Sequence, residues 1–179
     1  MGCSDPLVFA DPLVELAVRE QAQVPKGPIP RAAGEQVPEL LLVDERVTDL
    51  GGLGCLVNLE QLGIRYGEVT SLAPLRGLQR LKKLETTKLP ITSLVGLEES
   101  PLEWMEISDS EVEDLSPLSA VKTLQSLSVR RSPVGDLGPL SPLTAMFSLA
   151  KAMAFRDLST DCDQCSACEI ETISWPALH

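Results

Sequence analysis

Apolar residues recur at every third position from Val47 onward, and the series restarts at a nearly constant interval. The copies begin at Val47, Val69, Ile91, Val112 and Val134, which are 22, 22, 21 and 22 residues apart. On an α-helix each step of three residues slips by about 60°, so the apolar line would wind around the cylinder. Prolines within the copies would also interrupt such a helix. The pattern therefore predicts a repeat solenoid, in which one coil of chain closes about every 22 residues.

Each copy ends in a segment with alternating inward and outward positions, as residues 60–65 have, and we expect a short strand there. Stacked copies would place these strands in a parallel sheet on the concave face. The Leu-x-Pro-Leu segments at 72–75, 115–118 and 137–140 would turn the chain toward the convex side. One copy cannot bury its own leucines, so neighbouring copies and end caps must stabilise it. The predicted fold class is an α/β repeat, a leucine-rich-repeat solenoid.

The copies, with their Asp/Ser-Leu-x-Pro-Leu junctions, resemble bacterial leucine-rich repeats of the internalin-like, 22-residue type. The resemblance covers residues 37–149 and implies protein–protein recognition through the concave face. The family commonly has an Asn ladder that hydrogen-bonds buried backbone at the turn after each strand. Since Ser can partly replace Asn but Gly and Leu cannot, we expect the first turns to be less regular. The corresponding residues of this chain are Gly67, Leu89, Ser110 and Ser132.

Residues 8–20 are similar to the helical N-terminal cap of that family. Asp11 suits the N-cap and Pro12 the first helical position. Residues 37–43 would then form a first, irregular strand. The apolar residues expected to face the first repeat are Leu13, Leu16 and Ala17.

These observations divide the chain into three parts. Residues 1–46 form an N-terminal segment with the helical cap and the first irregular strand. Residues 47–155 contain five leucine-rich repeats, and residues 156–179 form a Cys-containing C-terminal cap or tail.

The outward strand positions fall into columns across the concave face, where side chains have no packing role and are free to contact a partner. One column contains Gln61, Lys83, Trp104, Ser126 and Ser148; the next contains Gly63, Glu85, Glu106 and Ser128; a third contains Arg65, Thr87, Ser108 and Arg130. The candidate partner-binding residues are Arg65, Lys83, Glu85, Trp104, Glu106, Ser128 and Arg130.

Trp104 is the most informative of these residues, because an outward Trp supplies a large contact area with a polar group at its edge. Two interpretations remain open. Trp104 is a hot spot for a partner, or it packs under the neighbouring strand or the C-terminal tail.

Three cysteines near the C-terminus, Cys162, Cys165 and Cys168, have C-x2-C-x2-C spacing. Three such thiolates can share Zn²⁺ or an iron–sulfur cluster if a fourth ligand is supplied, and no fourth Cys or His follows at a usual distance. The alternatives are free thiols, or disulfides at the C-terminal cap or between that cap and Cys55. Cys55 also lies between inward leucines, where a small packed residue would fit.

The first residues, Met1-Gly2-Cys3-Ser4, look like the Gly-Cys end of a bacterial lipoprotein signal, so Cys3 is a candidate for a lipid anchor. An ordinary cytosolic start is the alternative. No apolar run approaches the roughly 18–20 residues of a membrane helix. We therefore expect no transmembrane segment.

Charge and composition restrict the function further. The net charge of −11 disfavours nucleic acids and anionic membranes as partners. The single histidine is His179, which nearly excludes a Ser-His-Asp or Cys-His catalytic arrangement, and the sequence has no phosphate-binding loop.

The sequence thus predicts a non-catalytic, monomeric module without a cofactor that binds another protein. An extracytoplasmic or cell-surface location is favoured over a cytoplasmic one. The alternatives are an intracellular adaptor or regulatory subunit, and a metal- or cluster-binding protein that uses the C-terminal cysteines.

Overall fold

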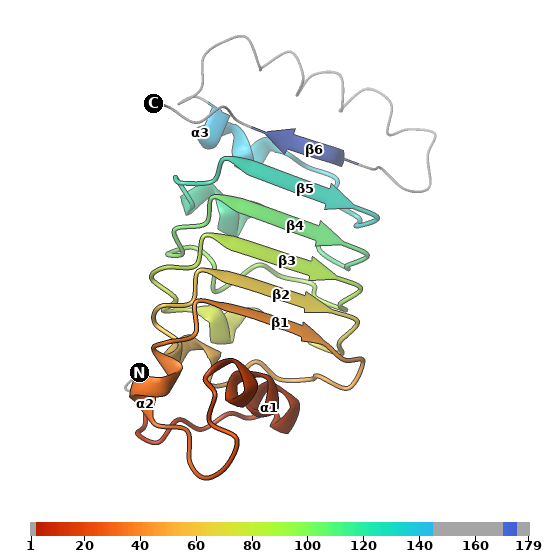
Figure 1. Ribbon diagram of the computed structural model, residues 1–179. Coiled ribbons are helices and arrows are strands. Elements are labelled where there is room, and N and C mark those ends of the chain that lie inside the picture. The colour runs from red at the N-terminus through yellow and green to blue at the C-terminus, as the bar shows by residue number, and fades with distance from the viewer. Residues whose placement is uncertain (1–2, 145–169, 175–179) are drawn as a thin grey trace.

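The structure, a computed structural model, describes residues 3–144 and 170–174. Over these residues the chain coils into a stack of repeats with the strands on one side (Figure 1). The strands form a single six-stranded sheet in chain order. They are β1 (Glu39–Val43), β2 (Gln61–Arg65), β3 (Lys83–Thr87), β4 (Trp104–Ser108), β5 (Ser126–Arg130) and β6 (Ile170–Ser174).

Strands β1 to β5 are parallel, and each pairs with the next at the same position of the repeat. This register confirms the predicted leucine-rich-repeat solenoid. The inward residues of adjacent strands stack on one another and are almost completely buried, so the core continues from coil to coil. One such inward row is Leu40, Leu62, Leu84, Met105 and Leu127.

The opposite side of the stack consists of short helical turns. The Leu-x-Pro-Leu segments form 3₁₀ turns with Pro in the first turn. Pro is tolerated there because an N–H at this position would have no hydrogen-bond partner within the turn. Their leucines point inward and complete the core between the sheet and the convex side. The turns with Pro are η2 (Ala73–Leu75), η3 (Ser116–Ala120) and η4 (Gly138–Leu140), and η4 runs into the short helix α3 (Ser141–Thr144). The turn η1 (Leu53–Cys55) of the first repeat has no Pro.

The C-terminal edge of the sheet differs from the prediction. Strand β6 pairs with β5 in the antiparallel direction, with Ser126 opposite Ser174 and Leu127 opposite Ile173. The five strands of the repeats are parallel as predicted, and a distant segment that the sequence analysis did not assign to a strand adds to this edge in the reverse chain direction. The strand predicted in the fifth copy, with Ser148, lies outside the described residues.

The turns after the strands are more regular than expected. Tyr66, Lys88, Asp109 and Arg131 follow β2, β3, β4 and β5, and all have a left-handed backbone with φ between 46° and 67°. The amides of Tyr66, Lys88 and Asp109 each donate to a carbonyl at the end of the next strand, at 2.9 to 3.0 Å. The expectation of irregular first turns is thus wrong for the backbone.

Different side chains fill these turns along the stack. Ser110 and Ser132 are buried and share a hydrogen bond of 2.8 Å between their Oγ atoms. In the earlier turns Leu89 is buried, and Gly67 leaves so little space that a Cβ there would lie 2.9 Å from the carbonyl oxygen of Val47. Apolar packing and close backbone approach therefore replace the side-chain ladder at the N-terminal end.

Helix α1 (Pro12–Gln21) lies against β1 at the N-terminal end of the stack (Figure 1). Asp11 is the N-cap, and its Oδ1 accepts from the Leu13 amide at 2.8 Å. Its other oxygen accepts from the Thr48 amide at 2.8 Å, which ties the helix to the first repeat. The predicted buried face is partly wrong: Leu16 is 60% exposed. Val14 and Val18 are the fully buried residues of this helix, with Leu13 and Ala17 partly buried beside them.

The segment before α1 is fixed to the first repeat by a disulfide between Cys3 and Cys55, whose Cα atoms lie 5.6 Å apart. Hydrogen bonds from Leu7 to Ile29 and from Ala10 to Gly51 hold the same segment, and the short helix α2 (Arg31–Gly34) precedes β1. The sequence analysis predicted Cys55 either as a small packed residue or as a disulfide partner of the C-terminal cysteines. The observed pairing is a correction, because the repeat turn places Cys55 beside the N-terminal segment.

Candidate recognition surface on the concave face

The exposed face of the sheet, which we call the concave face, presents the columns of side chains that the repeat spacing predicts. Gln61, Lys83, Trp104 and Ser126 occupy equivalent positions on successive strands. The other two predicted columns are also aligned. Strand β1 extends each column by one residue that the sequence analysis did not include. These residues are Glu39, Leu41 and Val43.

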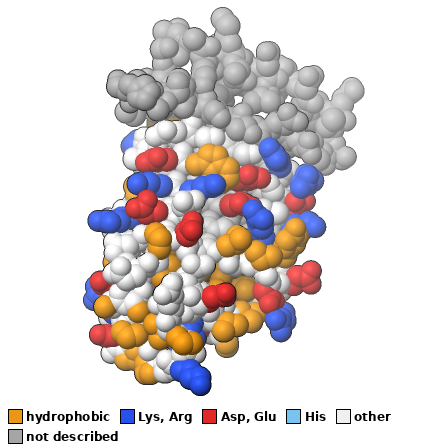
Figure 2. All heavy atoms as spheres, in the orientation of Figure 1, with side chains coloured by type: hydrophobic (Ala, Val, Ile, Leu, Met, Phe, Trp, Pro, Cys, Tyr) orange, Lys and Arg blue, Asp and Glu red, His pale blue; other side chains and the backbone are white. Residues whose placement is uncertain are grey.

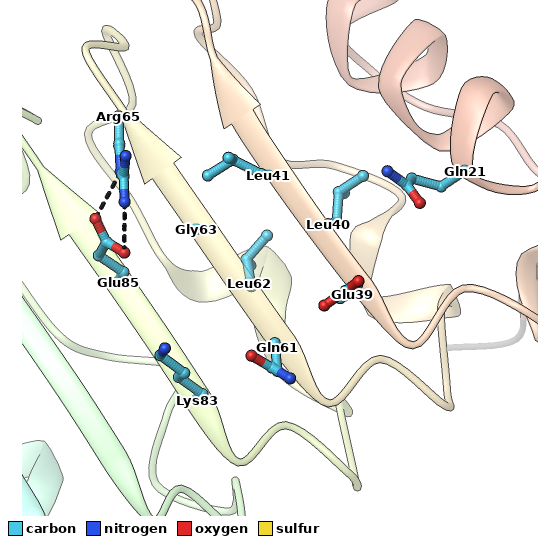
Figure 3. Close-up of a pocket in the computed structure, with 10 residues that line it drawn as sticks. All are labelled: Gln21, Glu39, Leu40, Leu41, Gln61, Leu62, Gly63, Arg65, Lys83 and Glu85. Carbon is cyan, nitrogen blue, oxygen red and sulfur yellow. Dashed lines mark hydrogen bonds and ion pairs between the residues drawn. The ribbon is translucent and has the colours of Figure 1, made fainter.

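Arg65 and Glu85 form a two-pronged ion pair across β2 and β3. The Arg65 Nε donates to Glu85 Oε1 at 2.6 Å and its Nη2 donates to Oε2 at 3.0 Å (Figure 3). The hydrogen bond and the charge of Glu85 raise the pKa of Arg65 above its usual value. Planar, two-pronged pairs fix orientation better than a single contact does. The two side chains therefore form one rigid polar element of the face.

Lys83 and Trp104 form the second contact between candidate residues. The Lys83 Nζ lies 4.8 Å from the centre of the Trp104 ring, within the range of a cation–π interaction. Trp104 itself is partly exposed on the concave face. The structure thus brings these two predicted residues together and leaves part of the indole accessible.

Glu106 and Arg130 are the third pair, with the Arg130 Nη1 4.0 Å from Glu106 Oε1. Ser108 donates from its Oγ to the same carboxylate oxygen at 3.3 Å. Ser128 differs from the other candidates because it is only 3% exposed. The place of Ser128 in the partner-binding surface therefore stays a prediction.

A shallow hollow of about 320 Å³ opens at the N-terminal end of this face, between α1 and β3. Among the predicted residues, Arg65, Lys83 and Glu85 line it (Figure 3). Its remaining lining comes from the end of α1 and from β1 and β2, and includes residues that the sequence analysis did not select. These are Gln21, Glu39, Leu40, Leu41, Gln61, Leu62 and Gly63.

The centre of the hollow is Gly63, the one glycine of the outward columns. A Cβ at this position would lie 2.6 Å from Leu41 Cδ1, so the Leu41 side chain leans over the glycine. Leu41 and Val43 are each 53% exposed on the same face of β1. Figure 2 shows hydrophobic side chains gathered at this end of the molecule. Counting back one repeat from Gly63 and Arg65 leads to Leu41 and Val43, so the repeat spacing alone would have identified these two residues.

A further row, also missed by the sequence analysis, follows the ends of the strands. The Lys88 Nζ lies 5.1 Å from the centre of the Tyr66 ring. Arg131 donates two hydrogen bonds of 2.6 Å to Asp109, and this pairing lowers the pKa of the Asp109 carboxyl. These residues could have been identified from the sequence, because each directly follows a predicted strand and they recur at the spacing of the repeats.

No group of His, Cys, Asp and Glu suited to a metal ion occurs among the residues that the structure describes. Cys162, Cys165 and Cys168 lie outside them, so the metal and disulfide alternatives for this cluster stay predictions. Within residues 3–144 and 170–174, no helix is long and apolar enough to cross a membrane.

The fold is similar to that of two solved structures from Listeria monocytogenes. Internalin C2 superposes with a TM-score of 0.63 at 21% identity, over 80% of this chain and 76% of that chain. The internalin InlF superposes with a TM-score of 0.63 at 23% identity, over 80% of this chain and 50% of that chain. The chain has the internalin-like leucine-rich-repeat fold. It spans about half the length of the InlF chain.

The internalin-like fold explains how these side chains come to share one face. Each strand contributes the same outward positions, so the columns follow from the repeat alone. No protein-family model and no curated protein sequence matches the chain. The evidence for the internalin-like fold is therefore structural.

Proposed function

We propose that the protein is a non-catalytic recognition module that binds another protein through the concave face of its solenoid. The observation that carries this proposal is the row of partly exposed side chains around Trp104. These side chains have no role in the core, yet Lys83 and the Arg65–Glu85 pair hold defined positions beside them. Preordered aromatic and arginine side chains are typical of the residues that dominate binding energy at protein interfaces.

Site-specific photo-crosslinking in the source cell tests this proposal. A photoreactive amino acid at Trp104 would lie on the concave face, whereas the same group at Val95 would lie in an exposed turn between β3 and β4. We expect one discrete protein adduct from position 104 and none from position 95. Equal adducts from both positions, or none from position 104 when the variant is folded, would contradict concave-face binding.

We also propose an extracytoplasmic location, which the Cys3–Cys55 disulfide supports because such bonds persist in oxidising compartments. The same sulfur cannot carry a thioether lipid at the same time, so the disulfide and a lipid anchor at Cys3 exclude each other. The mass of the protein isolated from its own cell, with and without reductant, distinguishes them. A gain of two hydrogens at this pair supports the disulfide, a lipid mass at Cys3 supports the anchor, and two free thiols contradict both.

A further inference from the structure

The hollow at the N-terminal end of the concave face contains polar groups that have no partner. Among the described residues, no hydrogen bond or ion pair involves the side chains of Glu39, Gln21 or Gln61. The Glu39 side chain is also exposed at the rim. An unpaired carboxylate and two unpaired amides therefore line an open hollow.

The positive charges of the same hollow are already engaged. Arg65 holds Glu85 through two hydrogen bonds, at 2.6 and 3.0 Å. The Lys83 Nζ lies 4.8 Å from the centre of the Trp104 ring on β4. Figure 3 shows that the Lys83 side chain points away from Glu39, which lies two strands away on β1. The formal charges of the lining side chains cancel, but Lys83 points away toward β4 and Arg65 is paired with Glu85, so Glu39 is the one lining carboxylate that has no ion-pair partner among the described residues.

The shape of the hollow suits a side chain with an apolar stem. Gly63 leaves a gap between Leu41 and Glu85 in the second column, and the half-exposed Leu41 leans over that gap. A lysine or arginine side chain has a hydrocarbon stem that packs on such a surface while its charged group stays near water.

One further feature favours a cation. The whole chain has a net charge of −11, which attracts basic partners at long range.

We propose that this hollow receives a lysine or arginine side chain of the partner protein. The stem packs on Leu41 above Gly63, and the cationic group binds the Glu39 carboxylate, with the amide oxygens of Gln21 and Gln61 as further acceptors. This inference rests on the proposed function, because it assigns one part of the concave face to one type of partner residue.

Blocked tripeptides with a central arginine, norleucine or glutamate, titrated into the ¹⁵N-labelled full chain, test the proposal by NMR. We expect saturable shifts of the amide signals of Glu39, Gln61 and Gly63 with the arginine peptide. The norleucine peptide should bind more weakly, and the glutamate peptide should produce no shifts there. Arginine binding should weaken as salt is added, because the pair is open to solvent.

Two variants and one control make the test specific. Glu39→Gln should weaken arginine binding by about threefold or more, as expected for loss of one exposed ion pair. Gly63→Val should remove the hollow and weaken both the arginine and the norleucine peptides. Glu68→Gln removes the same charge from an exposed loop outside the lining and should change neither affinity.

Equal shifts from the arginine and glutamate peptides would overturn the proposal. An unchanged arginine affinity in Glu39→Gln, or no saturable shift at the hollow, would do the same. These results leave the proposed function separately testable. A protein partner that still depends on Trp104 would show that the concave face binds without a cation in this hollow.

Discussion

Loss of the Cys3–Cys55 disulfide should lower the free energy of unfolding by up to about 4 kcal/mol. The bond joins residues 52 positions apart, and its removal lets the unfolded chain explore many more conformations. For a loop of that length the chain-entropy relation gives about 14 cal/mol/K, which is about 4 kcal/mol at 25 °C. The segment that it holds buries Leu7 and Phe9 at the N-terminal end of the core, so this end should loosen first.

Urea denaturation of the wild type and of Cys3→Ala, each with and without a dithiol reductant, measures this effect. Reductant should lower the wild-type midpoint to near that of Cys3→Ala. Any change of the urea midpoint that reductant still causes in Cys3→Ala comes from the other cysteines, and it is subtracted from the change in the wild type. A Cys3→Ala midpoint equal to that of the oxidised wild type would refute the reasoning, because the bond would then contribute no constraint.

Three further predictions concern the core, the N-cap and a strained turn. Leu84→Ala should cost about 3 kcal/mol in urea denaturation, since Leu84 is fully buried in the middle of the stack. Burial acts to raise the pKa of Asp11, but backbone hydrogen bonds from Thr48, Leu13 and Asp49 outweigh it, so the pKa is lowered. The stabilisation by Asp11 is thus complete above about pH 4 and is lost as the pH falls through the folded-state pKa of its carboxyl. The Asp11→Asn variant should be less stable than the wild type at pH 7, and its urea midpoint should depend less on pH. Gly52→Ala should lower the thermal midpoint, because φ is +100° and a Cβ would collide with the N-terminal segment, whereas Gly135→Ala, with nothing within 4 Å, should not.

The sequence was sufficient to predict strands β2 to β5 and their register. Inward leucines at a fixed spacing determine which residues of neighbouring coils lie side by side, so the order Gln61, Lys83 and Trp104 followed from counting. The same counting, taken one repeat toward the N-terminus, reaches Glu39 and Leu41, which line the hollow. These residues were missed because the strand at 37–43 was taken as irregular.

Features formed outside the repeat could not be predicted in this way. The pairing of Cys3 with Cys55 depends on how the N-terminal segment crosses the first coil, and no spacing encodes that path. Strand β6 adds to β5 from 40 positions further along the chain and in the reverse direction. Ser128 has the outward position that was predicted and is only 3% exposed, because the alternation of a strand gives the direction of a side chain and not its exposed fraction.

The affinity of the Trp104→Ala variant for the crosslinked partner is the most direct test of concave-face recognition. Truncation of a central aromatic residue at an interface costs about 2 kcal/mol or more, so we expect a loss of roughly thirtyfold in affinity. Val95→Ala, in the exposed turn between β3 and β4, is the matched control and should bind as the wild type does. Circular dichroism establishes that both variants are folded. An unchanged affinity in folded Trp104→Ala would contradict the assignment of the binding surface to the concave face.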